Sequence, residues 1–227
     1  MHTTHTTHRV RVWDLPTRLF HIALILAVAG LYITSEIEGE AMQIHFWLGY
    51  TVLALVLFRL AWGLVGGHWS RFVNFVPTPA KFVAYVQALR ARSATSHVGH
   101  NPLGALSVLT MLVVLLLQVF SGFMSDDDIS NAGPWAQLVP SHWVELATEY
   151  HSEIGQVLLI ILMGLHVATV LYYKFIKQDD LITPMVKGDK NLQTEAYASR
   201  DTWTSRIFAL SIFAACCYAV FRLVTMG

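Results

Sequence analysis

The stretch HSEIGQVLLIILMGLHVATVLYY, residues 151–173, decides how this sequence folds. It is mostly apolar and long enough to cross a hydrocarbon core as a helix, which takes about 20 residues. It also carries two histidines, His151 and His166, which are 15 positions apart. Fifteen residues rise about 22 Å and make slightly more than four helical turns. We therefore expect the two imidazoles on roughly the same face of one helix, one near each membrane surface.

Other parts of the chain have the same character. The expected spans are residues 15–34, 45–65, 103–124, 154–175 and 203–224. The 227 residues are 55% hydrophobic and 13% charged, with 15 basic and 15 acidic side chains. This composition argues against disorder, a nucleic-acid binder and an ordinary cytosolic enzyme. It predicts an all-α integral membrane helical bundle, with a short interfacial helix at 80–91 and an extended surface loop at 177–202.

The charged residues predict the orientation of the chain, because connections rich in Lys and Arg stay on the cytoplasmic side. The N-terminal segment and the second and fourth connections hold 13 of the 15 Lys and Arg residues. The first and third connections hold Glu36, Glu38, Glu40, Asp126, Asp127, Asp128, Glu145 and Glu149. We therefore expect a cytoplasmic N-terminus, a periplasmic C-terminus and an acidic outer face. Helical spans indicate a bacterial inner (cytoplasmic) membrane.

Four histidines fall inside or at the ends of the spans, where ionisable groups are costly and indicate function. By depth they form an inner pair, His21 with His166, and an outer pair, His45 with His151, in which each member opens its span. Two pairs of facing imidazoles are what two bis-histidine b-type haems require, and bundle cores build such sites from facing helices. With both axial positions filled, the haems suit electron transfer rather than oxygen binding.

Other interpretations of the histidines stay open. They could be hydrogen-bonding side chains that join helices in a haem-free membrane anchor. They could also line a metal-transport path, because imidazole binds zinc, copper, iron and nickel. Transport favours carboxylates beside the histidines in mid-membrane, and the nearest acid is Glu153, at the outer edge.

Glycines and arginines near the histidines fit a bound macrocycle. Gly49 and Gly155 each follow a histidine of the outer pair by one turn, and glycine removes the side chain where a flat ring approaches a helix. Close packing of helices through small residues is the alternative. Arg59, near the inner end of the second span, and Arg18, one turn before the first histidine, match a haem propionate in geometry. Snorkelling to the inner interface is the alternative for both arginines.

Four pieces of sequence carry a family resemblance: RVRVWDLPTRLFH (9–21), HFWLGYTVLALVLFRLAWGLVG (45–66), GHNPLG (99–104) and residues 151–173. With them the chain resembles the bacterial cytochrome b-561 family, which includes the cytochrome b subunits of nickel–iron hydrogenases and formate dehydrogenases, and the superoxide oxidases. The resemblance implies a four-helix core that holds two b haems and exchanges electrons with quinone. His21, His45, His151 and His166 match the family's ligand positions. The fifth span departs from the four-helix core.

The expected organisation follows from this resemblance. We expect a single membrane domain over residues 1–227. Within it, residues 9–189 form a two-haem cytochrome b core, and residues 190–227 form a loop and an extra C-terminal transmembrane helix. The resemblance places quinone near the inner haem, close to Trp13, Asp14 and Arg18.

The expected function is transmembrane electron transfer between a periplasmic redox partner and the membrane quinone pool. The partner is a c-type cytochrome, a dehydrogenase or a hydrogenase, and an acidic outer face attracts a basic protein. The same face repels superoxide, so a superoxide–quinone oxidoreductase is kept as the alternative. No catalytic side chain is nominated, because the haems do the chemistry and the protein positions and tunes them.

Overall fold

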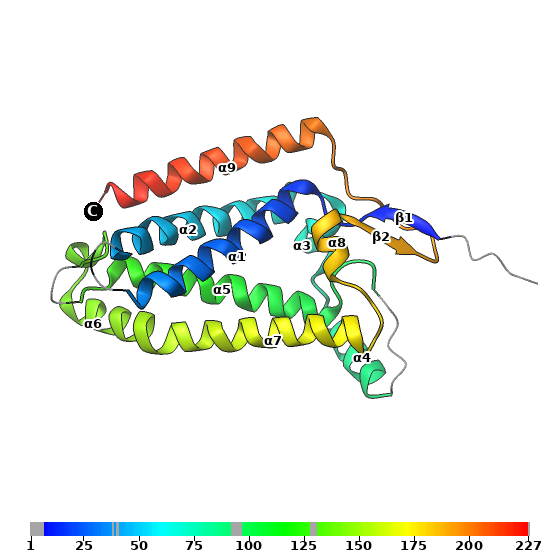
Figure 1. Cartoon of the computed structure of the whole chain (residues 1–227), viewed down its shortest axis with the longest axis horizontal. Coiled ribbons are helices and arrows are strands. Elements are labelled where there is room, and N and C mark those ends of the chain that lie inside the picture. Colours follow the sequence, from blue (N-terminus) through cyan, green and yellow to red (C-terminus); the bar gives the residue numbers. More distant parts are fainter. Residues whose placement is uncertain (1–6, 38, 40, 92–96, 128–130, 227) are drawn as a thin grey trace, which may run out of the picture. The chain divides into compact units, whose positions relative to one another are not determined.

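A computed structural model describes residues 7–37, 39, 41–91, 97–127 and 131–226 of the chain. The long helices are α1 (Leu15–Ser35), α2 (Ala41–Val65), α5 (Pro102–Met124), α7 (Gln156–Phe175) and α9 (Trp203–Val224) (Figure 1). The short helices are α3 (Phe72–Phe75), α4 (Pro79–Arg90), α6 (Ser141–Glu149) and α8 (Ile182–Lys187). Glu38, Glu40 and Asp128 of the expected acidic face lie outside the described residues.

Five helices are long and apolar enough to cross a membrane, and they coincide with the five expected spans. Large apolar side chains on these helices are exposed, such as Leu26, Leu64 and Leu165. Lipid is the solvent that such surfaces require. The fold is therefore an all-α membrane helical bundle, as expected. The short helix expected at 80–91 is confirmed as α4.

The fourth span begins earlier than its composition indicated. It runs without interruption over Ser141–Phe175, and a turn of π-helix at Tyr150–Gly155 joins α6 to α7. The expectation that His151 opens this helix is therefore wrong, because the polar first turns of α6 hide the true start. His45 likewise lies one turn inside α2, which begins at Ala41. Single π-helical turns are rare and are often found at functional sites.

The described chain divides into two compact units. The first unit comprises Met1–Leu19, Ala61–Leu109 and His166–Ala209, and the second comprises Phe20–Leu60, Thr110–Leu165 and Leu210–Gly227. Each long helix contributes residues to both units. Apart from Arg59 and Arg222, every described Lys and Arg belongs to the first unit.

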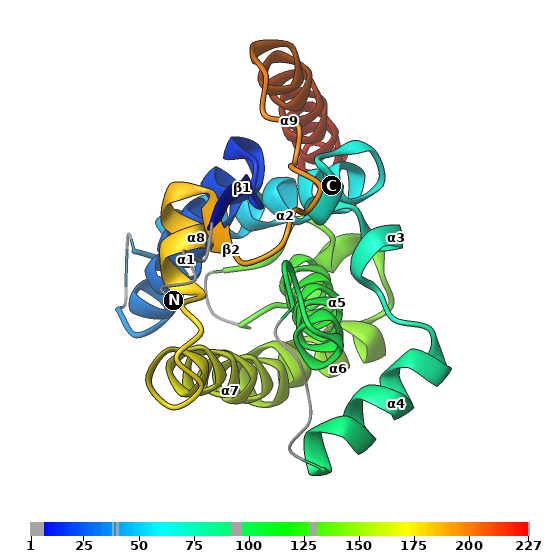
Figure 2. The same cartoon turned by 90° about the vertical axis from the view of Figure 1, so that its right-hand side faces the viewer.

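In the second unit, α2 is the central helix. Val52, Leu53 and Val56 of α2 are completely buried. Part of α9 lies along α2, and the rings of Phe58 and Phe213 meet there edge to face at 5.9 Å (Figures 1 and 2). Side chains of the neighbouring helices therefore pack against α2.

In the first unit, the segment after α7 is folded rather than an extended surface loop, so that expectation is wrong. Strand β1 (His8–Arg11) pairs antiparallel with β2 (Asp189–Leu192), with Arg11 opposite Asp189. Helix α8 lies beside β2 and ends at Gly188, which has a φ of 93° (Figure 2). Glycine adopts this left-handed conformation without a steric penalty. Paired residues of the two strands are 178 to 184 positions apart, so this pairing could not be read from local patterns.

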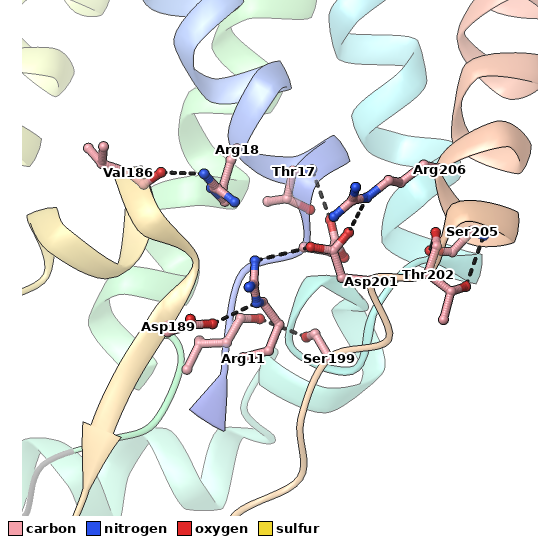
Figure 3. A network of polar contacts seen from close by, with 12 residues as sticks. Arg11, Thr17, Arg18, Val186, Asp189, Ser199, Asp201, Thr202, Ser205 and Arg206 are labelled. Atoms are coloured by element: carbon pink, nitrogen blue, oxygen red, sulfur yellow. Dashed lines mark hydrogen bonds and ion pairs between the residues drawn. The ribbon is translucent and has the colours of Figure 1, made fainter. Parts of the chain in front are cut away.

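An ion-pair network fastens the segment before α9 to the N-terminal strand (Figure 3). Arg11 contacts Asp189 at 2.6 Å and Asp201 at 3.1 Å. Asp201 also contacts Arg206 of α9 at 2.9 Å. The amide of Ser199 donates to the carbonyl of Arg11 at 2.7 Å. These contacts fix where α9 begins.

Candidate functional site

The second unit brings two of the predicted histidines close together. The ring centroids of His45, on α2, and His151, in the π-helical turn before α7, lie 6.1 Å apart. Their planes meet at 83°. Both side chains are only partly exposed to solvent. The outer pair expected from the sequence is therefore a close pair in the structure.

The ring of His45 is oriented by α1. Its Nδ1 lies 3.2 Å from the carbonyl oxygen of Leu31 and 3.3 Å from the hydroxyl of Thr34. A carbonyl oxygen only accepts, so Nδ1 carries the proton and donates it. The other ring nitrogen, Nε2, then keeps its lone pair. A histidine that binds a metal is typically held in this way by its second nitrogen.

The ring of His151 is oriented by α5 in the same manner. Its Nδ1 lies 2.8 Å from the carbonyl oxygen of Gln118 and donates to it. The Gln118 side-chain amide donates in turn to the carbonyl of His151 at 2.8 Å. The hydroxyl of Ser121 lies 3.4 Å from the same Nδ1. Nε2 of His151 is therefore the nitrogen with an available lone pair.

The separation of the two rings fits a shared metal ion. Imidazole nitrogens bind metals such as zinc at about 2.0–2.1 Å, and the ring centre lies roughly 1 Å further back, so two axial imidazoles put their centroids about 6 Å apart. The 6.1 Å between His45 and His151 agrees with this value. Two neutral imidazoles at this separation could hold a haem iron, which would supply one-electron redox chemistry.

Glycines near this pair differ in what surrounds them. A Cβ on Gly49 would meet nothing within 4 Å, so the space beside it is open. A Cβ on Gly155 would collide with the side-chain oxygen of Gln118, so Gly155 permits close packing of the fourth span against α5. The place of Gly155 beside a macrocycle stays a prediction. A Cβ on Gly122 would lie 2.6 Å from Cε1 of His151, so this glycine makes room for the ligand ring itself.

The inner pair is divided between the two units. His21 lies on α1 in the second unit, and His166 lies on α7 in the first. Both side chains are partly exposed. Their pairing stays a prediction from depth and from the family resemblance.

The two predicted arginines have different surroundings. Arg59 is only 3% exposed, which excludes snorkelling to an interface. Arg18 donates from Nη2 to the carbonyl of Val186, in α8 (Figure 3). Its Nε is buried and has no hydrogen-bond partner among the described residues. A role for either guanidinium toward a haem propionate stays a prediction.

Asp14 is completely buried and has a structural role. Its carboxylate accepts hydrogen bonds from the amide of Thr17 at 2.9 Å, the hydroxyl of Ser70 at 2.8 Å and the amide of Gly67 at 3.1 Å. The indole of Trp62 donates to it at 3.2 Å. A buried carboxylate needs such partners, and here they join the start of α1 to the end of α2. Asp14 therefore offers no support for the expected quinone contact.

A cavity of about 560 Å³ lies in the first unit, between the α3–α4 region and the residues before α5. Aromatic and apolar side chains line much of it, together with Lys81, His97 and His100. The ring of His100 packs against Phe75 at 4.6 Å and against Trp13 at 4.8 Å. Trp13, expected near quinone, contacts His100 of the cavity lining but is not itself a lining residue.

Several residues of the site were not predicted from the sequence. Thr34, Gln118 and Gly122 all touch or orient a ligand ring. Gln118 had a usable signal, because it is the one amide side chain in the apolar run 106–120. Thr34 and Gly122 are ordinary residues at the end of a span, and only packing gives them a role.

The bundle and its oriented histidine pair are compatible with a membrane cytochrome. The family model described as prokaryotic cytochrome b561 matches residues 12–188, so the chain belongs to this family. It is accordingly a multi-pass membrane cytochrome b, which holds haem b and transfers electrons. The resemblance found in the sequence is confirmed.

Relatives with assigned names agree with this family. A probable Ni/Fe-hydrogenase B-type cytochrome subunit of Azotobacter vinelandii is 26% identical over an alignment of 213 residues, which covers 79% of this chain and 87% of the relative. A subunit of the same name from Rhizobium leguminosarum bv. viciae is 24% identical, and the alignment covers 80% of this chain and 88% of the relative. The probable Ni/Fe-hydrogenase 1 B-type cytochrome subunit of Escherichia coli K12 is 23% identical, and the alignment covers 78% of this chain and 88% of the relative. No solved structure matches the chain.

Proposed function

We propose that this cytochrome is a transmembrane electron conduit with two bis-histidine b haems. His45 and His151 hold the outer haem, and His21 and His166 hold the inner one. The observation that carries the proposal is the outer pair, whose centroids are 6.1 Å apart and whose Nδ1 groups both bond to carbonyls of neighbouring helices. When bound, haem iron supplies reversible one-electron redox chemistry.

The side chains around the outer pair prepare it for ligation. Hydrogen bonds from Nδ1 fix the tautomer and the orientation of each ring, and they raise the basicity of the ligand nitrogen. Gly122 leaves room for the ring of His151, and the open space at Gly49 leaves room for a flat group one turn from His45. Arg59 and Arg18 are the proposed partners of haem propionates, and Gly155 is a proposed glycine beside the haem macrocycle.

The proposed organisation is one membrane domain over residues 1–227, with the two-haem core at 9–189 and the loop and extra helix at 190–227. The proposed location is the bacterial inner membrane, with the N-terminus in the cytoplasm and the C-terminus in the periplasm. The distribution of charge supports this orientation, because the first unit holds nearly all the described Lys and Arg residues.

The proposed redox partner is a hydrogenase-type enzyme on the outer side. The relatives are named as cytochrome subunits of Ni/Fe-hydrogenases, which supports this choice. A basic c-type cytochrome is the second candidate, and the acidic residues Asp126, Asp127, Glu145 and Glu149 favour it. Electron transfer from a basic cytochrome c that is unchanged by ionic strength would rule out electrostatic steering.

The proposed electron acceptor or donor within the membrane is quinone, and the cavity of about 560 Å³ is its proposed site. Ligand pockets are typically of this size, mostly apolar and aromatic, with a few polar groups that fix orientation. Tyr85, His97 and His100 supply such groups here.

The proposal is tested on protein purified from cells with ample haem supply. We expect two haems per chain by pyridine haemochrome assay, and reoxidation of the dithionite-reduced haems when a quinone analogue is added. A folded, colourless protein would support a haem-free anchor or metal transporter instead. Rapid oxidation of superoxide with reduction of quinone would support the superoxide–quinone oxidoreductase.

A further inference from the structure

A second cavity, of about 290 Å³, lies in the first unit at the end of α2. Its wall includes the side chains of His68, Arg71, Tyr197 and Arg200, together with the backbone of Gly66 and Gly67. Neither the haem ligands nor the proposed quinone cavity includes these residues. The proposed haem and quinone sites therefore give this cavity no function.

Two cations of this cavity lack an anionic partner. Among the described residues, no carboxylate forms an ion pair with Arg71 or Arg200, although Arg11 and Arg206 of the same unit do form such pairs. The Nε atom of Arg71 is buried and has no hydrogen-bond partner within the described residues. A buried donor without a partner is costly, so a group that accepts a hydrogen bond from this nitrogen would stabilise it.

The carboxylate of Asp14, which lies beside Gly67, does not neutralise the cavity. Asp14 lies behind Gly67, and its oxygens accept hydrogen bonds from the amide of Gly67 and the hydroxyl of Ser70. These hydrogen bonds satisfy the Asp14 carboxylate within the fold, and Asp201, next to Arg200 in the sequence, is paired with Arg11 and Arg206. The permanently charged residues that line the cavity are both arginines, Arg71 and Arg200.

The wall of the cavity is held in place. The ring of His68 stacks on Tyr197, with centroids 5.3 Å apart and planes at 25°. The indole of Trp69 donates to the carbonyl of Tyr197 at 2.7 Å, and its amide donates to the hydroxyl of Ser199 at 3.2 Å. These contacts hold residues 197–200, and so Arg200, next to the end of α2. A site with a fixed wall binds at a lower entropic cost.

We propose that Arg71, Arg200 and His68 form a binding site for a phosphate group. Guanidinium matches phosphate in geometry and can bind it through two parallel hydrogen bonds. The cavity lies at the end of a span, the level at which lipid headgroups lie, and basic pockets at such positions bind anionic headgroups. The phosphate is supplied by an anionic phospholipid or by free inorganic phosphate, and both sources present the same chemistry.

The test uses the full-length haem-loaded protein. In the first arm, native mass spectrometry counts phosphatidylglycerol retained from nanodiscs that mix it with phosphatidylcholine. In the second arm, delipidated protein in detergent is titrated with inorganic phosphate by calorimetry. The variants are Arg71→Gln and Arg200→Gln, and the matched control is Arg90→Gln, an exposed arginine at the end of α4.

We expect both variants to weaken binding about tenfold or more, because each removes a charge-assisted hydrogen bond to the phosphate. Arg90→Gln should bind like the wild type. Lipid retention alone identifies a headgroup site, phosphate binding alone identifies a free-phosphate site, and both together indicate a site open to either. Binding by neither, or equal binding in all variants, would overturn the proposal. Loss of haem but not of lipid in Arg71→Gln would overturn it as well, because the guanidinium would then serve a propionate.

Discussion

The Nδ1 atoms of His45 and His151 each lie within hydrogen-bond distance of a backbone carbonyl of a neighbouring helix, which leaves the lone pairs of the two Nε2 atoms available. The ring centroids lie 6.1 Å apart, a separation that is compatible with the proposed ligation of one haem iron by both histidines. This relationship connects helix packing directly to cofactor binding, and the first predictions follow from it.

Replacing either ligand of the outer pair should remove one haem. We expect His45→Ala and His151→Ala each to reduce the haem content from two per chain to one, because a haem with one axial ligand is held weakly. The measurement is the pyridine haemochrome assay on purified protein. His142→Ala, an exposed histidine of α6, is the control and should keep both haems. Full haem content in both ligand variants would refute the outer site.

Gly122→Ala should disturb the same haem without removing a ligand. The added methyl group would lie 2.6 Å from Cε1 of His151, a contact that forces the ring to shift. We expect a change in the reduction potential of one haem, or its loss, in a potentiometric titration. A titration identical to that of the wild type would show that the ring position is not critical.

Gly49→Ala tests whether the open space beside α2 holds the macrocycle. Gly164→Ala is the matched control, since a Cβ at either glycine meets nothing within 4 Å of the protein. We expect Gly49→Ala to lower haem occupancy several-fold, and Gly164→Ala to have no effect. The measurement is the reduced-minus-oxidised haem spectrum of each variant. Equal haem signals in Gly49→Ala and Gly164→Ala would show that the macrocycle does not lie beside Gly49.

His166→Ala tests the inner pair. We expect the inner haem to be lost and the outer one to remain, so that reduced-minus-oxidised spectra show about half the b-type signal of the wild type. His21→Ala should give the same result. Loss of both haems together in a folded protein would leave the proposed pairing of His21 with His166 without support.

The ion pairs of Asp201 should make stability depend on pH. Burial alone raises the pKa of this carboxyl, but hydrogen bonds and charges, chiefly from Arg206, outweigh burial and hold the pKa below its ordinary value of 3.8. A pKa lowered by folding adds stability that is complete above 3.8 and is lost as the pH falls through the lowered value. We therefore expect Asp201→Asn to unfold at a lower temperature than the wild type at neutral pH.

The difference in unfolding temperature between the wild type and Asp201→Asn should become smaller when unfolding is measured below pH 3.8. Glu195→Gln serves as the control, because Glu195 is exposed and forms no ion pair among the described residues. Its unfolding temperature should follow that of the wild type at every pH. A constant difference for Asp201→Asn down to acidic pH would contradict the assigned ion pairs.

The sequence by itself determined the class of fold, because a run of about 20 apolar residues leaves the backbone no option in lipid but a helix. It also identified His45 and His151, since an ionisable side chain is conspicuous in such a run. The start of the fourth span was misplaced because the polar residues of α6 carry no hydropathy signal, although they continue the same helix.

Only the tertiary structure decided which groups complete the site. The carbonyls of Leu31 and Gln118 orient the two rings, and backbone carbonyls leave no trace in the amino-acid sequence. The pairing of β1 with β2 joins segments far apart in the chain, where no local pattern specifies a partner. Gly122 and Asp14 owe their roles to packing, because a glycine beside a ring and a carboxylate among four donors look ordinary until distant residues are brought together.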